Sequence, residues 1–471
     1  MTITPHMTRT ATQTAAAVQS GAISAEAVAT HALADINRLN PIVNAYTDIT
    51  TERALTEARA VDKRLAAGET LPLAGVPYAV KNLFDIESVV TRAGSKINLS
   101  NQPASADASL IQRLSQAGGV LTGGLHMGEY AYDFTGENAH DGNCLNPHDT
   151  TRMTGGSSSG SGAAAASGMV PITLGSDTNG SIRVPSSFCG LFGLKPTFGR
   201  LSRAGSFPFV GDLDHLGPLA RTAEDLALVF DVLQGHDPAD PAQANRPGIA
   251  TKATLSEGIE NLRIAVAGGY FRKSGQPEAF NAVDLVAAEL GANREIDIPE
   301  AARARAAAYI ITTAQSSALH LGRLKKQPEN FDPDTRDRFL SGAMVPAVWV
   351  QQAQRFRTWF QHQMRDIFKD VDVLLAPTTP FHALPSGTKT VVLDGVELPA
   401  RPNIGLFTQP ISFIGLPVVS VPVWLEGAAL PIGVQVIAPA WREDIALRVA
   451  HHLQHSGAVS APVAGITTGI N

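Results

Sequence analysis

The sequence contains very little cysteine and no long hydrophobic run. Only Cys144 and Cys189 occur among 471 residues, too few to serve as a disulfide framework, so we expect a reducing, cytoplasmic compartment. No stretch of about 18 apolar residues is present, which argues against a membrane span. Residues 1–20 also lack the apolar core of a secretory signal peptide.

The chain likewise has no excess of positive charge. It carries 37 lysines and arginines against 43 acidic residues, a formal net charge of −6, and therefore no basic field that would attract phosphate backbones or anionic lipids. We expect neither a nucleic acid nor a membrane as a partner. With 44% hydrophobic and 17% charged residues, the composition is that of an ordinary globular protein.

Strand and helix patterns alternate along the chain. Residues 73–80, 120–121, 170–174 and 262–267 are typical of buried strands, and helical patterns such as the one after Ser24 separate them. This alternation predicts an α/β fold with a large, twisted, mixed and mostly parallel sheet.

The last third of the sequence adds three local predictions. Residues 373–377 form a short apolar run that predicts a buried strand, and the pair Asp394 and Gly395 between two apolar runs predicts a β-hairpin. A final helix is expected at residues 443–454.

Two glycine loops that carry serines are the most informative feature. Ser157 lies in a Gly-Gly-Ser-Ser turn, where small residues permit unusual backbone angles. Ser181 ends the run Asp-Thr-Asn-Gly-Ser, whose consecutive backbone amides can converge into an anion-binding nest. One crossover between the loops could bring both serines to the same edge of a sheet.

Lys81 completes a set of groups suited to amide hydrolysis. It follows the apolar residues 76–80, and an ammonium at the end of a buried strand is desolvated, which favours the neutral amine, a base. Each motif alone is weak, because glycine-serine runs are usually linkers and isolated lysines are usually solvated. Together they offer a hydroxyl nucleophile, a proton relay, a base and oxyanion donors, with no need for a metal or cofactor.

These segments, in this order, resemble the amidase signature family from about Ser24 to about Ser456. The resemblance implies an amidase-signature fold, with helices on both faces of the sheet, and hydrolysis of linear amide C–N bonds. We expect an N-terminal polar segment at 1–22, one domain at 23–460 and a C-terminal tail at 461–471.

The resemblance also implies roles for individual residues. Ser181 would be the acylated nucleophile, Ser157 the relaying hydroxyl, in a cis peptide with the preceding residue, and Lys81 the final base. The implied oxyanion hole consists of the backbone N–H groups of Thr178, Asn179, Gly180 and Ser181. The implied supporting residues are Gly156, Ser158, Asp177 and Arg183.

One departure from the family pattern matters, since most members carry glycine where this chain has Asn179; Ser159 and Ser161 also replace commoner glycine or alanine, with little expected effect. A backbone N–H survives the change, so the oxyanion hole can still form. The asparagine side chain adds a polar group near the substrate and is expected to alter specificity.

Five segments, at 73–85, 93–98, 175–181, 193–202 and 408–413, resemble one branch of the family, and the Asn179 variant belongs to that likeness. That likeness implies release of ammonia from a small, anionic, carboxylated ureide. It also implies a small non-catalytic partner, similar to the C subunit of the tRNA-dependent amidotransferase, and allows for a heterotetramer. Neither the substrate nor the partner follows from composition or spacing.

Several rival interpretations remain open at this point. A glutaminase subunit of a tRNA-dependent amidotransferase, or another small-amide amidase, would use the same nucleophile. The glycine loop lacks the Gly-Lys-Ser/Thr ending of a phosphate-binding loop, and an inactive scaffold would be free to lose one of the three catalytic residues. A metal-dependent hydrolase is the sharpest competitor from another class, with these candidate ligands: His126, Glu129, Glu137, His140, Asp141, Cys144 and His148.

A substrate carboxylate would need cationic or multiple hydrogen-bonding partners. The candidates are Arg183, Arg200 and Arg203, although Arg183, with Asp177, fits a bracing role better. We interpret His215 as a structural histidine rather than a catalytic one.

Overall fold

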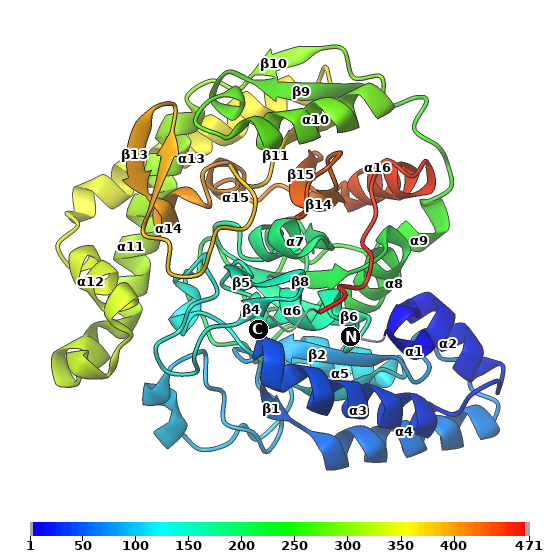
Figure 1. Cartoon of the computed structure of the whole chain (residues 1–471). Helices are drawn as coiled ribbons and strands as arrows, with labels where there is room; N and C mark the ends of the chain where they lie inside the picture. The colour runs from blue at the N-terminus through cyan, green and yellow to red at the C-terminus, as the bar shows by residue number, and fades with distance from the viewer. Residues whose placement is uncertain (1–2, 467–471) are drawn as a thin grey trace.

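An eleven-stranded sheet forms the centre of the molecule in the computed structural model, which describes residues 3–466. The strand order is β1-β3-β2-β6-β8-β7-β14-β15-β11-β9-β10. In Figure 1 the sheet runs from β1 at the bottom to β10 at the top, with α3 and α4 near its β1 end and α10 near β9.

The strands of this sheet and of two small hairpins have the following bounds: β1 Tyr46–Ile49, β2 Pro77–Lys81, β3 Val120–Leu125, β4 Leu145–Asn146, β5 Asp149–Met153, β6 Ile172–Asp177, β7 Phe192–Lys195, β8 His215–Ala220, β9 Ile264–Gly268, β10 Glu295–Asp297, β11 Val373–Pro377, β12 Thr390–Leu393, β13 Val396–Pro399, β14 Val418–Val423 and β15 Ile432–Ile437.

The α-helices are α1 Pro5–Thr8, α2 Ala11–Gln19, α3 Ala25–Val43, α4 Thr51–Ala66, α5 Ser109–Gln116, α6 Ser159–Ala166, α7 Arg183–Cys189, α8 Ala223–Leu233, α9 Thr251–Thr254, α10 Pro277–Glu289, α11 Ala301–Lys326, α12 Pro333–Gly342, α13 Ala347–Ile367, α14 Ala400–Asn403, α15 Gln409–Ser412 and α16 Glu443–His455. Short 3-10 helices occur at η1 Lys96–Ser100, η2 Glu129–Ala131, η3 Gly269–Arg272 and η4 Pro328–Asn330.

The sheet is mixed, as expected, but it is not mostly parallel. Only four of its ten neighbouring pairs are parallel, β3-β2, β2-β6, β11-β9 and β9-β10, and six are antiparallel. A short connection, such as residues 424–431 between β14 and β15, can only return antiparallel. The alternation of patterns indicates which segments are strands and does not reveal their pairing order.

Local sequence signals account for many element boundaries. The Ser24 hydroxyl accepts a hydrogen bond from Ala27 N at 3.1 Å and caps α3. Asp394 and Gly395, with φ of 49° and 76°, form the tight turn that the β12-β13 hairpin needs. The strand expected at 170–174 instead extends to Asp177, so the second glycine loop begins on β6.

Helices cover both faces of the sheet. On β8, Leu219 packs with the alanines of α6 and with α7 residues, whereas its neighbour Ala220 packs with α8. Successive residues of a strand point to opposite faces, so α6 and α7 lie on one side and α8 on the other.

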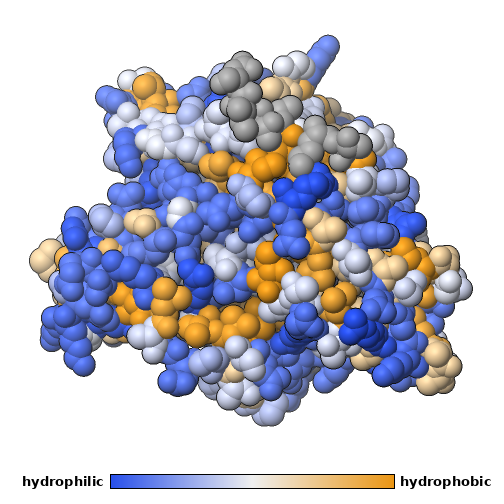
Figure 2. Space-filling model, turned by 60° about the horizontal axis from the view of Figure 1, so that its bottom comes forward, coloured by the Kyte–Doolittle hydropathy of each residue, from blue (hydrophilic) through white to orange (hydrophobic). Residues whose placement is uncertain are grey.

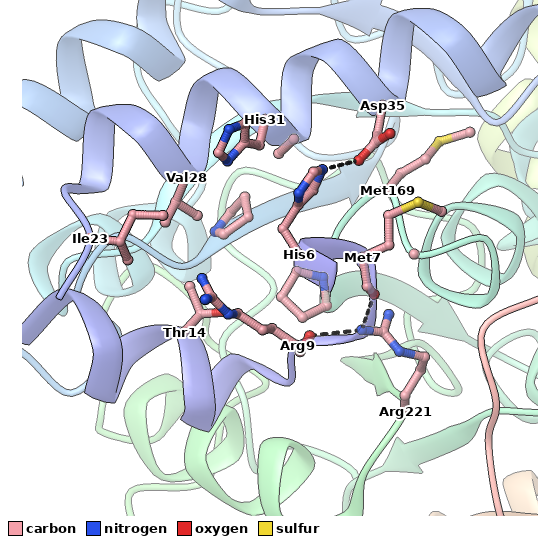
Figure 3. A pocket seen from close by; sticks show the side chains of 14 residues that line it. His6, Met7, Arg9, Thr14, Ile23, Val28, His31, Asp35, Met169 and Arg221 are labelled. Carbon is pink, nitrogen blue, oxygen red and sulfur yellow. Dashed lines mark hydrogen bonds and ion pairs between the residues drawn. The ribbon is translucent and has the colours of Figure 1, made fainter. Parts of the chain in front are cut away.

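The N-terminal residues fold as helices against this core. Arg221 donates to the carbonyl oxygens of Met7 at 3.0 Å, Arg9 at 2.9 Å and Ala165 at 2.9 Å. Figure 3 shows Arg221 reaching Met7 and Arg9, and His6 paired with Asp35 at 2.7 Å. Through Arg221, these hydrogen bonds connect the helices within residues 5–19 to α6. The domain boundaries expected at 22 and 460 stay a prediction.

The face turned toward the viewer in Figure 2 is mainly hydrophilic, with hydrophobic residues in several separate patches. Within residues 3–466, no helix combines the length and the apolar composition needed to cross a membrane.

Asp225 provides a test of how α2 is held. This buried carboxylate accepts from Ala11 N, Thr12 N and the Thr12 hydroxyl, each at 2.9 Å, and places negative charge at the helix N-terminus. We expect Asp225→Ala to lower the free energy of unfolding by about 1–3 kcal/mol, because it leaves buried donors unpaired. Thermal unfolding measures the loss.

The matched control is Asp284→Ala, which removes a carboxylate that is 61% exposed and pairs with Arg272. We expect this change to lower the unfolding free energy by less than about 1 kcal/mol. Equal losses in the two variants would contradict the role assigned to Asp225.

Candidate active site

The Lys81 amine lies within hydrogen-bond distance of two serine hydroxyls, at the edge of the sheet where β2 and β6 have their carboxyl ends. Lys81 is the last residue of β2, and Nζ lies 2.7 Å from Ser157 Oγ and 2.8 Å from Ser176 Oγ. Ser176 lies near the end of β6, the parallel neighbour of β2. The ends of adjacent parallel strands meet at one edge, which explains the convergence.

Burial sets the protonation of Lys81. The side chain is fully buried and forms no ion pair within the described residues. Removal from water lowers the pKa of Lys81 to about 7, although the more distant carboxylates of Asp177, Asp214 and Asp133 act in the opposite direction. A large fraction of the amine is therefore neutral near pH 7.

Ser157 occupies the turn that leads into α6, and its peptide bond with Gly156 is cis, as the family resemblance implies. A side chain at residue 156 would come within 2.8 Å of Asp133 Oδ2, so only glycine fits there. Ser158 ties this turn to β6, since its Oγ donates to Ser176 O at 3.1 Å and accepts from Ser176 N at 3.2 Å.

Ser181 follows the loop at 178–180 and is 3% exposed. Its hydroxyl makes no hydrogen bond to another protein group in the part of the chain that is described. Gly180 has a φ of 144°, and a side chain there would meet Thr408 Oγ1 at 2.3 Å. The loop before Ser181 can therefore follow this path only with glycine at 180.

Side chains from distant elements hold the loop. Thr178 Oγ1 donates to Asp214 Oδ1 at 2.6 Å, and Asn179 Nδ2 donates to Thr312 Oγ1 of α11 at 2.9 Å. Thr408 Oγ1 donates to the backbone oxygen of Asn179 at 2.6 Å. These anchors were missed in the sequence, because nothing at 214, 312 or 408 indicates proximity to residues 178–179.

A buried ion pair lies directly beneath the loop. Asp177 accepts from Arg183 Nε and Nη2, each at 3.0 Å, and both side chains are fully buried. Burial alone would raise the pKa of Asp177, but the Arg183 guanidinium outweighs that effect and the pKa falls. Arg183 also donates to Gln435 Oε1 at 2.6 Å, so this arginine is occupied and braces the loop.

The other two candidate arginines are also engaged. Arg200 pairs with Glu443 at 3.3 Å, and Arg203 lies 3.5 Å from Asp240 and donates to Gly211 O at 2.7 Å. Arg203 alone of the three lines a cavity of about 250 Å3 that also borders Ser176 and Asp214.

His215 is buried beside the ion pair. Its Nδ1 lies 2.6 Å from Leu213 O and 3.0 Å from Asp177 O, and burial lowers its pKa well below the usual value. The ring is thus held neutral against backbone carbonyls, in keeping with a structural role.

The seven candidate metal ligands are dispersed. His126 contacts Ser159 and Gly142, Glu129 pairs with His140, Glu137 pairs with Arg401, and His148 contacts Cys189 O. Across residues 3–466, no three His, Cys, Asp or Glu side chains converge as a set that could hold a metal ion.

Comparison with known proteins identifies the class to which this chain belongs. The model of the amidase family matches residues 27–447, so the chain belongs to that family.

Two relatives span nearly all of the chain. It is 52% identical to AtzE of Pseudomonas sp. (strain ADP), which is a 1-carboxybiuret hydrolase subunit, over 93% of this chain and 97% of that protein. It is 35% identical to the A subunit of glutamyl-tRNA(Gln) amidotransferase from Chromohalobacter salexigens, over 95% and 96% of the two chains.

A solved structure has nearly the same backbone. It is an inhibitor-bound form of a vestigial protein complex of an s-triazine catabolic enzyme, with 50% identity, a TM-score of 0.95, and coverage of 96% of this chain and all of that one. The chain is therefore an amide-hydrolysing enzyme closely related to 1-carboxybiuret hydrolase.

The Asp177–Arg183 pair generates a stability prediction. Arg183→Met leaves a buried carboxylate without its cation, and we expect the free energy of unfolding to fall by about 3–5 kcal/mol. Chemical denaturation monitored by circular dichroism measures the change.

Arg263→Met is the matched control, because Arg263 also pairs with an aspartate, Asp372, but is 52% exposed. Its loss should lower the free energy of unfolding far less, because exposed ion pairs contribute little to stability. If Arg183→Met were no more destabilising than Arg263→Met, Asp177 and Arg183 would not brace the site.

Proposed function

We propose that this enzyme hydrolyses a small amide through an acyl-enzyme on Ser181, with Ser157 as the proton relay and Lys81 as the base. The observation that carries the proposal is the Lys81 amine, which is fully buried and lies 2.7 Å from Ser157 Oγ, with no carboxylate partner among residues 3–466. A neutral amine in this position can accept the proton of a serine hydroxyl.

In the proposed reaction, Ser181 Oγ forms a bond to the substrate carbonyl carbon. Its proton passes to Ser157 Oγ, and the Ser157 proton passes to Lys81 Nζ. The relay then runs in reverse, Ser157 protonates the leaving nitrogen, and the C–N bond breaks to release ammonia. Water, deprotonated by the same relay, hydrolyses the ester and frees Ser181.

The backbone N–H groups of the loop are proposed to stabilise the oxyanion that forms during attack. Donors fixed before the reaction contribute most to such stabilisation. The proposed donors are Thr178, Asn179, Gly180 and Ser181. Support for this role comes from the anchors at Asp214, Thr312 and Thr408, which hold residues 178 and 179.

The remaining site residues are proposed to act by positioning. Ser176 fixes the Lys81 amine from a second side at 2.8 Å. Gly156 and Ser158 shape the turn that presents Ser157, and Asp177 with Arg183 supports the loop that presents Ser181. No metal or cofactor has a part in the proposed mechanism.

We propose a small, anionic, carboxylated ureide as the substrate, most specifically 1-carboxybiuret. The 52% identity to a 1-carboxybiuret hydrolase subunit supports this choice. The second candidate is glutamine hydrolysis within a tRNA-dependent amidotransferase, favoured by the 35% identity to the A subunit of such an enzyme.

We further propose a small non-catalytic subunit, resembling the amidotransferase C subunit, as a partner in a cytoplasmic heterotetramer. The related s-triazine catabolic enzyme occurs in a protein complex, which supports a heteromeric assembly.

The pKa of Lys81 leads to a prediction about pH. Because the base must be uncharged and its pKa is about 7, kcat/KM should be constant above that pH and fall about tenfold per pH unit below it. Lys81→Met should lose several powers of ten in rate. Steady-state ammonia release across pH 5–9 measures both.

Lys195 serves as the control, since burial also lowers its pKa to about 7 although it bonds only backbone carbonyls. Lys195→Met should keep the acid limb where it is in the wild type. Movement or loss of that limb in Lys195→Met would mean that Lys81 is not the group that titrates.

The substrate proposal is tested with a panel of amides, with and without a co-expressed small subunit. We expect kcat/KM to be highest for 1-carboxybiuret and lower for biuret, glutamine and fatty amides, with ammonia as the measured product. Ser181→Ala should be inactive toward every member. Equal turnover of all four substrates would reject the carboxylated ureide, and a preference for glutamine would favour the amidotransferase interpretation.

A further inference from the structure

One buried acceptor at the active site has no partner. Asn179 is 7% exposed, its Nδ2 donates to Thr312 Oγ1 at 2.9 Å, and its backbone oxygen accepts from Thr408 Oγ1 at 2.6 Å. Its Oδ1 is buried and accepts no hydrogen bond in the described chain. A buried acceptor left unpaired is costly, so a bound molecule that supplies a donor would be favoured there.

The anchor residues limit where this acceptor can lie. Thr312 is 1% exposed on α11, and its hydroxyl fixes the amide group of Asn179 through Nδ2. The Thr408 hydroxyl fixes the backbone of the same residue. Oδ1 is therefore a pre-positioned group two residues before Ser181, and not a mobile side chain at the rim.

The position of Asn179 determines which part of a substrate it can reach. Its backbone N–H is one of the proposed oxyanion donors, and its side-chain amide starts from the same Cα. An acceptor on this Cα has the attacked carbonyl carbon and its substituents as its nearest substrate groups, and the substituent that stays after ammonia leaves differs between substrate classes. In a ureide this substituent is an N–H, a donor; in an ordinary carboxamide it is a CH2, which cannot pair with Oδ1.

We propose that Asn179 Oδ1 accepts a hydrogen bond from the retained N–H of a ureide, and that this contact makes the enzyme select ureides over carboxamides of the same shape. The inference rests on the proposed function, because it requires attack by Ser181 on a terminal carbamoyl group. Sites that hydrogen-bond a substrate donor discriminate strongly against analogues that lack it, because the protein group is then left unpaired.

Two isosteric substrate pairs test the inference directly. Biuret and malonamide differ only in an NH replaced by CH2, and allophanate and malonamate differ in the same way. In the wild type we expect a higher kcat/KM for the ureide of each pair, measured as ammonia release. Asn179→Ala also removes the Thr312 anchor of the oxyanion loop, so kcat/KM should fall for both substrates of a pair. The ureide should lose about 10–100-fold more than the carboxamide, the effect of one buried hydrogen bond.

Thr312 supplies a graded test of the anchor. Thr312→Val should reduce the ureide preference by a smaller factor, about 3–10-fold, because Oδ1 remains but is no longer held. Thr312→Ser keeps the hydroxyl and should restore the preference. Thr313→Val is the matched control, since the Thr313 hydroxyl bonds only to Tyr309 O and Ile310 O of the same helix.

The rate at which a fluorophosphonate labels Ser181 reports on the nucleophile and the oxyanion hole without using a substrate N–H. It should fall by a similar factor in Asn179→Ala and in Thr312→Val, because both variants lose the same anchor. Equal losses for ureide and carboxamide, or no loss for either, would overturn the inference while leaving the proposed hydrolysis intact. A wild type that is labelled at Ser181 but turns over no ureide would overturn the proposed substrate class, and this inference with it.

Discussion

The active site depends on the burial of the Lys81 amine, which has no counterion in the described part of the chain. A charged lysine in contact with a carboxylate would be a poor base, because the ion pair would stabilise the ammonium. Lys81 instead faces two hydroxyls, and the nearest acidic groups act on it only from a distance. The carboxylates of Asp177, Asp214 and Asp133 therefore stabilise the loops around the site, but they are too far from Lys81 to outweigh the effect of burial on its pKa.

Each of these three carboxylates binds a group other than Lys81. Asp177 is neutralised by Arg183, Asp133 pairs with Arg401 at 2.5 Å, and Asp214 accepts from Thr178 and from the backbone N–H groups of Phe209 and Val210. Charged and polar groups that are satisfied in this way rigidify their surroundings. The loops that carry Ser157 and Ser181 are consequently fixed by residues far apart in the sequence.

Much of this arrangement could be predicted from the sequence, and the reasons for success and failure differ. The Ser24 cap, the Asp394-Gly395 turn and the strand at 373–377 depend on local sequence, so they could be predicted without knowledge of the fold. The proximity of Lys81 and Ser157 was expected from the family resemblance, and the geometry agrees for that pair, whereas the catalytic roles stay a prediction. The prediction of a mostly parallel sheet was wrong, because strand order depends on contacts between segments that are distant in the sequence. Thr312, Thr408 and Asp214 were missed for the same reason, and so was Ser176, which stands beside Asp177 in the sequence but has a role only in three dimensions.

The contacts of Arg221 and Asp225 with the first helices also bear on how the chain reaches this state during synthesis. Arg221 binds Met7 O, and Asp225 binds Ala11 N, in each case across 214 residues of sequence. Nearly half of the polypeptide must therefore be synthesised before Met7 and Ala11 can form these two hydrogen bonds. Until then the first helices can make only their contacts with nearer residues, such as that of His6 with Asp35, so their final anchoring comes late in synthesis.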